Sequence, residues 1–174
     1  MDDPQRLWET LTHVNAWIRF ADAKAGGLLT LGGAFGGALL MWLGDPSSAA
    51  RGATTISIVL LAVSVVAALG VAVNALLCLA PLTDPVDSEY QTTIFFGHIA
   101  QHDSWRSFFQ SMRQEDTDRL LQDLSHQVYE NSRIATYKFR KIARASQFTA
   151  AMILLSGMGW AIEVGKSVSQ AFGT

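Results

Sequence analysis

Hydrophobic positions dominate three long stretches of the chain, and the polar positions are concentrated between them. No charged side chain occurs in residues 25–43, in residues 53–80 or in residues 145–162. A helix needs about 20 mainly apolar residues to cross a bilayer, because the hydrocarbon core is about 30 Å thick. The pattern therefore predicts three transmembrane helices at these positions.

The first predicted span is the second half of a longer helical pattern. From residue 7 onward, apolar residues recur at alternating steps of four and three: Leu7, Leu11, Val14, Ile18, Ala21, Ala25 and Leu28. That spacing marks one face of an α-helix, and it continues through the charged residues Arg19, Asp22 and Lys24. Asp3 followed by Pro4 is a typical helix start. We predict one helix over residues 4–43, and we expect residues 1–24 to lie outside the membrane.

A second long helix is predicted from about Asp116 to Ala161. Its apolar positions follow a heptad, with Leu121, Val128, Ala135 and Ile142 at one core position and Leu124, Asn131, Lys138 and Ala145 at the other. The polar members, Asn131 and Lys138, allow two interpretations. Asn131 fixes the helix register while Lys138 snorkels or pairs with an acid, or both line a polar pocket for a ligand. Residues 92–101 are predicted to be irregular, with a short strand as the alternative, and Ser104 resembles an N-cap.

The distribution of lysine and arginine predicts the orientation in the membrane. Three such residues precede the first span, Arg51 alone lies in the first loop, eight lie between the second and third spans, and Lys166 alone follows. We therefore place the N-terminus and residues 81–144 in the cytoplasm, and the first loop and the tail 163–174 outside. Trp42 and Trp160 then both fall at the outer interface, where indole rings are enriched.

A cleavable signal peptide ending near Ser47–Ala50 is the rival interpretation of the first span. It is disfavoured because the apolar run is longer than a usual signal core and more than twenty residues precede it. Composition agrees with membrane insertion, since 49% of the 174 residues are hydrophobic and only 16% are charged. The expected fold is an all-α membrane protein with three transmembrane helices, two of them extended into a cytoplasmic helical bundle. The net charge of −2 gives no reason to expect a nucleic-acid polymer as partner.

Asp22 is the most informative single residue, because a carboxylate at the bilayer edge is costly unless it is paired. Arg19, one turn earlier, and Lys138 are candidate partners, whereas Lys24 lies on the other side of the helix. A structural clamp is favoured over a proton relay or a ligand contact.

Four glycines in the first span form two overlapping G-x-x-x-G pairs. These are Gly32, Gly33, Gly36 and Gly37. Small residues four apart allow close helix approach in lipid, either between copies in a homo-oligomer or against the chain's own second or third span.

The sequence offers no recognisable catalytic site. It contains no nucleophile elbow, no glycine-rich phosphate loop after a strand and no paired acidic motif, so an enzyme is not expected. His98 and His102 are four residues apart, a spacing that permits shared metal ligation on a helix. No cysteine or carboxylate constellation completes such a site, and we predict neither a metal nor a cofactor. The single cysteine, Cys78, lies in an apolar run and is interpreted as a packing residue.

Three segments together resemble the transmembrane Pycsar effector family. They are ADAKAGGLLTL (21–31), IFFGHIA (94–100) and QVYENSRIATYKFRKIARA (127–145), and the resemblance covers about residues 20–162. Relatives often carry a longer aliphatic run where this chain has glycines. The resemblance implies an antiphage effector in the bacterial inner membrane. In such systems a partner pyrimidine cyclase makes cyclic UMP or cyclic CMP after infection, and the effector damages the membrane, so that the infected cell stops growing or dies.

A pocket for such a ligand needs a cation for the phosphate, aromatic rings for stacking and an amide for the base edge. The cytoplasmic region offers candidates for each role: Phe96, Gln127, Asn131, Arg133, Tyr137, Lys138 and Arg140. Two other functions fit the same three spans. One is a ligand-independent small channel or holin-like pore. The other is a non-enzymatic scaffold that recruits a soluble partner through residues 81–144.

Overall fold

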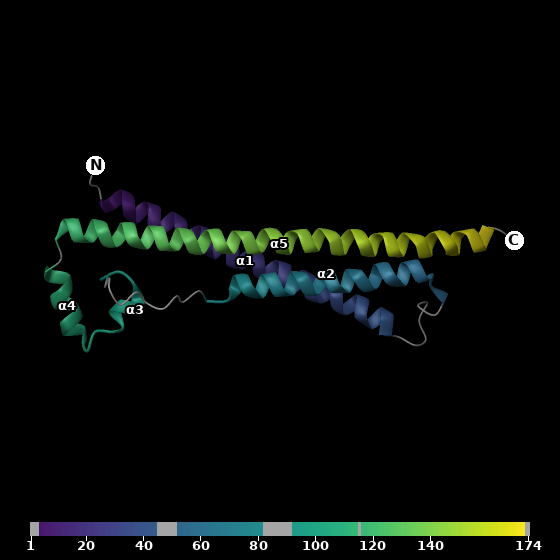
Figure 1. Ribbon diagram of the computed structural model, residues 1–174, viewed down its shortest axis with the longest axis horizontal. Coiled ribbons are helices and arrows are strands. Elements are labelled where there is room, and N and C mark those ends of the chain that lie inside the picture. Colours follow the sequence, from purple (N-terminus) through teal and green to yellow (C-terminus); the bar gives the residue numbers. More distant parts are fainter. Residues whose placement is uncertain (1–3, 45–51, 82–91, 115, 173–174) are drawn as a thin grey trace. The chain divides into compact units, whose positions relative to one another are not determined.

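A computed structural model describes residues 4–44, 52–81, 92–114 and 116–172, and every regular element in those ranges is a helix (Figure 1). Asp3 and the segment 47–50, which carry the predicted N-cap and the alternative cleavage site, lie outside them. The elements are α1 (Pro4–Gly44), α2 (Thr55–Leu79), α3 (Phe96–Ile99), α4 (Trp105–Gln114) and α5 (Thr117–Phe172). The all-α fold expected from the sequence is confirmed.

Helix α1 is one uninterrupted helix, as predicted for residues 4–43. Every member of the predicted apolar stripe is buried or half-buried, whereas the charged residues Arg19 and Lys24 are exposed and Asp22 is half-buried. The stripe then continues toward the end of the helix through Gly32, Gly36 and Leu39. The reason is a regular repeat of about 3.5 residues, which keeps one face of a helix turned toward its neighbours over many turns.

Helix α5 follows the predicted heptad and extends it. Leu124, Lys138, Ile142 and Ala145 are buried, and the same two positions continue with further buried residues. These are Thr149, Met152, Ser156 and Gly159. The helix ends at Phe172 rather than near Ala161. Nothing in this stretch breaks a helix, because it contains no proline.

The segment between α2 and α5 is only partly irregular. The prediction for residues 92–101 is wrong at Phe96–Ile99, which form the short helix α3. Thr92 stabilises this turn, since its Oγ1 accepts a hydrogen bond from the backbone N–H of Phe95 at 3.1 Å. The predicted N-cap Ser104 is confirmed at the start of α4, where its Oγ accepts from the N–H of Ser107 at 3.2 Å.

The chain packs as two compact units, and α1 and α5 each contribute to both. Unit 1 comprises residues 1–21 and 80–138, and unit 2 comprises residues 22–79 and 139–174. The division falls after Ala21 on α1 and after Lys138 on α5, ahead of the predicted membrane boundaries at 25 and 145. Helices α1, α2 and α5 are each long and apolar enough to cross a membrane. On α2, large apolar side chains such as Val59, Val66 and Leu69 remain exposed, as expected for a surface that faces lipid.

Candidate functional site

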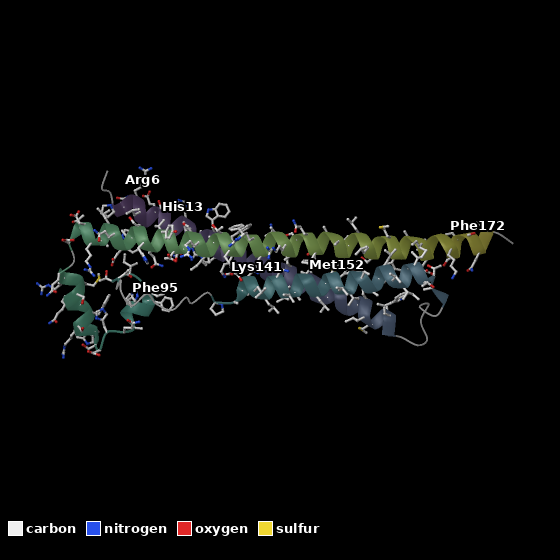
Figure 2. The ribbon with its side chains drawn as sticks, in the orientation of Figure 1. Arg6, His13, Phe95, Lys141, Met152 and Phe172 are labelled. Carbon is white, nitrogen blue, oxygen red and sulfur yellow. The ribbon has the colours of Figure 1, made fainter. Side chains whose placement is uncertain are left out.

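A buried hydrogen bond between α2 and α5 lies in the core of unit 2. Ser57, Ser64, Val71 and Cys78 recur every seven residues along α2 and are all completely buried. Ser64 donates a hydrogen bond from Oγ to the backbone carbonyl of Met152 on α5 at 2.9 Å, and Met152 is labelled in Figure 2. Hydrogen bonds between helices are one of the forces that hold membrane bundles together, because lipid supplies no hydrophobic drive. The buried Cys78 confirms the packing role expected for it.

The two glycine pairs on α1 face different surroundings. A Cβ on Gly32 would lie 2.9 Å from Cγ1 of Val71, and a Cβ on Gly36 would lie 2.8 Å from Cβ of Ala68. These two glycines therefore allow α2 to approach α1 closely. A Cβ on Gly33 or Gly37 would meet nothing within 4 Å. One pair serves packing within the chain, and the other is open to a neighbour outside it.

A carboxylate clamps the end of unit 2 that follows the third predicted span. Oε1 of Glu163 accepts hydrogen bonds from the backbone N–H of Thr54 at 2.8 Å and from the Thr54 hydroxyl at 2.9 Å. It also accepts one from the hydroxyl of Ser57. These donors stand at the start of α2, where a helix favours negative charge. The bonds from Ser57 and Thr54 hold the pKa of Glu163 below its ordinary value.

Two other contacts join the same end of unit 2. Lys166 donates from Nζ to the backbone carbonyl of Gly52, which places both charged residues of this turn of α5 against the segment that precedes α2. The rings of Trp42 and Trp160 lie 5.1 Å apart between centroids at an interplanar angle of 56°. The two indoles that the sequence assigned to one interface therefore occupy the same end of the helix bundle.

An amide network spans α1 and α5 within unit 1. Nδ2 of Asn131 donates to Oδ1 of Asn15 at 2.8 Å, and Nε2 of Gln127 donates to Oδ1 of Asn131 at 2.9 Å. The predicted seam residue Asn131 thus has a partner on the facing helix. This geometry favours the interpretation in which Asn131 fixes the helix register.

The other predicted ligand residues lie on two sides of α5. Lys138 is 6% exposed, on the same face as Asn131, and such burial favours pairing over snorkelling for its ammonium group. Arg133 and Arg140 lie about 180–200° round the helix from Asn131, at about 100° per residue, and both are exposed. Arg133 forms an ion pair with Glu130 at 3.2 Å. Tyr137 is half-buried. One copy of α5 therefore does not present the arginines and Asn131 to the same ligand.

Phe96, the remaining predicted ligand residue, belongs to a compact segment of unit 1 that starts at Thr92 and is fixed by side-chain hydrogen bonds. The backbone N–H of Thr92 donates to Nδ1 of His98 at 3.0 Å. The next N–H, that of Thr93, donates to Oδ2 of Asp123 on α5 at 2.9 Å. The loop is therefore attached to α5 through a completely buried carboxylate. Phe96 itself is 71% exposed.

Sequence reasoning did not single out Asn15, Asp123 or Glu163. Each is a polar residue whose partner is distant in the sequence, so no local motif identifies it. For Glu163 the sequence does offer one indication, which is its place in the heptad. It lies seven residues after Ser156 on the seam of α5. Within the described ranges, no three His, Cys, Asp or Glu side chains are grouped closely enough to hold a metal ion. His98 and His102 instead contact Thr92 and Ser107.

A family model described as the Pycsar effector protein domain matches residues 6–163. The match covers α1 from Arg6 onward, α2, α3 and α4, and α5 as far as the clamp residue Glu163. Comparison with curated proteins and with solved structures gave no significant match.

Proposed function

The chain belongs to the family of Pycsar effector proteins, which act in antiphage defence, and from this membership we propose that it is a membrane effector switched by a cyclic pyrimidine nucleotide. On binding cyclic UMP or cyclic CMP it impairs the inner membrane, and the infected cell stops growing or dies. A pyrimidine cyclase supplies the ligand. The protein is multi-pass, with its N-terminus and unit 1 in the cytoplasm.

The observation that supports this proposal is the continuity of α1 and α5. Each is a single helix that contributes to the polar unit 1 and to the apolar unit 2. A ligand shifts an equilibrium only if it binds one arrangement better than the other. A nucleotide held in unit 1 that changes how α1 and α5 pack there acts on the same two helices that cross the membrane.

The amide pair Asn15–Asn131 is one place for such a change. The base edge of a pyrimidine offers donors and acceptors that can replace an amide, so a ligand that bonds Asn131 or Gln127 competes with the contact between α1 and α5. Lys138, one heptad later on the same face, supplies a positive charge for the phosphate. Arg133 and Arg140 would contact the same nucleotide only from a second copy of the chain or after a rearrangement.

We further propose that the effector is a homo-oligomer joined through Gly33 and Gly37. These glycines repeat, on the open side of α1, the four-residue spacing that Gly32 and Gly36 use against α2. Replacing both Gly33 and Gly37 by leucine is expected to abolish cross-linked oligomers in membranes. Gly27 and Gly44 also have open surroundings. Replacing these two glycines by leucine serves as the control and should leave the cross-linking pattern unchanged.

Liposome leakage provides the direct test. Purified protein in dye-loaded vesicles should release dye when cyclic UMP or cyclic CMP is added and not with cyclic AMP. Lys138→Met should weaken the response at least tenfold, and the exposed Arg144→Met on the same helix should not. Leakage without any nucleotide would indicate a constitutive pore instead. No leakage under any condition, with a soluble protein co-purifying through residues 81–144, would indicate a scaffold.

A further inference from the structure

His98 is a buried histidine whose tautomer is fixed by its neighbour. Only 7% of its surface is exposed. Its Nδ1 accepts the backbone N–H of Thr92 at 3.0 Å, so Nδ1 carries no proton and the neutral ring carries its proton on Nε2. His98 thus presents one N–H donor from Nε2.

That donor has no acceptor among the described residues, although Nε2 is buried. A buried donor without a partner destabilises the folded state by about as much as a lost hydrogen bond. Such groups are rare in native proteins, and each one points to strain, to an ordered water or to a function. The surrounding loop is otherwise well bonded, since Thr92, Thr93 and Phe95 all place their backbone N–H groups on side-chain acceptors.

Aromatic rings lead from this donor to the surface. The ring of Phe95, labelled in Figure 2, stands edge-on to His98 with centroids 5.3 Å apart. The ring of Phe96 lies 4.7 Å from that of Phe95 and is the most exposed aromatic side chain of the loop. A Cβ on Gly97 would lie only 2.6 Å from Cε1 of Phe95, so glycine at this position allows the ring to fold over the turn. The exposed ring of Phe96 is therefore linked to His98 through the ring of Phe95.

The charge around the donor selects the kind of acceptor. Asp123 binds the N–H of Thr93, directly beside the N–H of Thr92 that holds His98. A carboxylate bound to this loop disfavours a phosphate group there. The acceptor that suits the Nε2–H of His98 is consequently a neutral oxygen, such as the carbonyl of a heteroaromatic ring.

We infer that the loop from Thr92 to Ala100 reads the base of the activating nucleotide, with Nε2–H of His98 donating to a pyrimidine carbonyl oxygen and the ring of Phe96 stacking on the base. This inference rests on the proposed sensor function, and it places the base on this loop instead of at Asn131 and Gln127. Aromatic stacking is a common contribution to nucleotide binding that does not depend on the identity of the base. The hydrogen bond provides the orientation, because the buried donor is left unsatisfied if a base lacks an acceptor there.

Calorimetry with the full chain in detergent tests the inference. His98→Asn keeps an acceptor near the position of Nδ1 for the N–H of Thr92 and removes the Nε2 donor, so the loop should keep its fold. We expect at least tenfold weaker binding of cyclic UMP or cyclic CMP. Phe96→Leu should weaken binding at least fivefold. Phe109→Leu, which changes a similarly exposed phenylalanine on α4, should leave the affinity unchanged.

The outcomes separate this inference from the proposed function. If the wild-type chain binds neither nucleotide, the sensor function itself is excluded, and the base site with it. If the wild type binds while His98→Asn and Phe96→Leu bind equally well, the base site is refuted and the sensor function stands. A second measurement uses histidine labelled with ¹⁵N. The resonance of the Nε2–H proton of His98 is the one that is absent from the spectrum of His98→Asn. This resonance should move downfield when the ligand binds. If it is unchanged at saturating ligand, the assignment is overturned.

Discussion

Nδ2 of Asn131 on α5 donates to Oδ1 of Asn15 on α1 across 2.8 Å, a contact between residues 116 positions apart in the sequence. It is a polar contact on a seam that is otherwise largely apolar on both helices. A single amide at such a position fixes which turn of one helix faces which turn of the other, at some expense in stability. The pair therefore aligns the two long helices of unit 1.

The amide pair is testable by a double-mutant cycle. Asn15→Ala and Asn131→Ala should each lower the thermal midpoint in detergent by about 2–4 °C, since each leaves a partner unsatisfied at a cost of about 1 kcal/mol. The thermal midpoint of the double variant should fall by less than the sum of the two single decreases. Ser132→Ala, which removes only a bond to the same helix, serves as the control. Strictly additive effects would show that the two amides do not interact.

The glycines of α1 give a matched pair of substitutions. Gly36→Ala places a methyl group 2.8 Å from Cβ of Ala68, so the helices must separate and the protein should lose about 1–3 kcal/mol of stability. Gly27→Ala adds the same methyl group into open space outside the proposed oligomer contact and should stabilise the helix by up to about 1 kcal/mol. Thermal unfolding in detergent would show midpoints shifted in opposite directions. Equal shifts would contradict the assignment of Gly36 to the α1–α2 contact.

The serines of unit 2 allow a similar comparison. Ser64 donates to the carbonyl of Met152 on another helix, whereas Ser156 donates to that same carbonyl within its own helix. Ser64→Ala should therefore destabilise by about 0.5–1.5 kcal/mol, and Ser156→Ala should change stability by less than half as much. Chemical unfolding in mixed micelles would measure both. A larger effect for Ser156→Ala would argue against a stabilising contact between α2 and α5.

Glu163 makes stability depend on pH. Hydrogen bonds from Ser57 and Thr54 lower its pKa from an ordinary value of 4.5. Its contribution is therefore fully present above that ordinary value and is lost as the pH falls through the lower pKa of the folded state. The thermal midpoint of the wild type should fall over this acidic range, and Glu163→Gln should reduce that dependence. Glu130→Gln, which alters an exposed pair with Arg133, is the control that should behave like the wild type.

The sequence predicted the long helices well because their signal repeats. An apolar stripe on α1 and a heptad on α5 each recur over many turns, so a local irregularity such as Arg19 or Lys138 does not obscure them. The sequence does not indicate which glycine pair faces α2, because Gly32 and Gly33 are adjacent. Only the position of Val71 and Ala68 in the structure distinguishes the pair Gly32 and Gly36 from the pair Gly33 and Gly37. The C-terminal extension of α5 differs from the prediction because the predicted helix ends with its apolar run near Ala161, whereas α5 continues to Phe172.

The loop around His98 was beyond sequence reasoning for a different reason. Its order comes from single hydrogen bonds, Thr92 to His98 and Thr93 to Asp123, rather than from a repeated pattern. Short segments of this kind carry little propensity signal, and the partner on α5 lies 30 residues away from Thr93. The predicted ligand residues were chosen by side-chain type, which does not reveal that Asn131 and Arg133 face opposite directions on one helix.

The indole pair Trp42 and Trp160 provides an intrinsic spectroscopic probe of this end of the helix bundle. With ring centroids 5.1 Å apart, the two chromophores are close enough for their excited states to couple, so the near-ultraviolet dichroism of the protein carries a contribution from this contact. Any movement that separates the ends of α1 and α5 would remove that contribution from the spectrum. The change could be measured without an added label. Activation by a nucleotide could then be followed in real time on the unmodified chain, with Trp160→Phe as the blank.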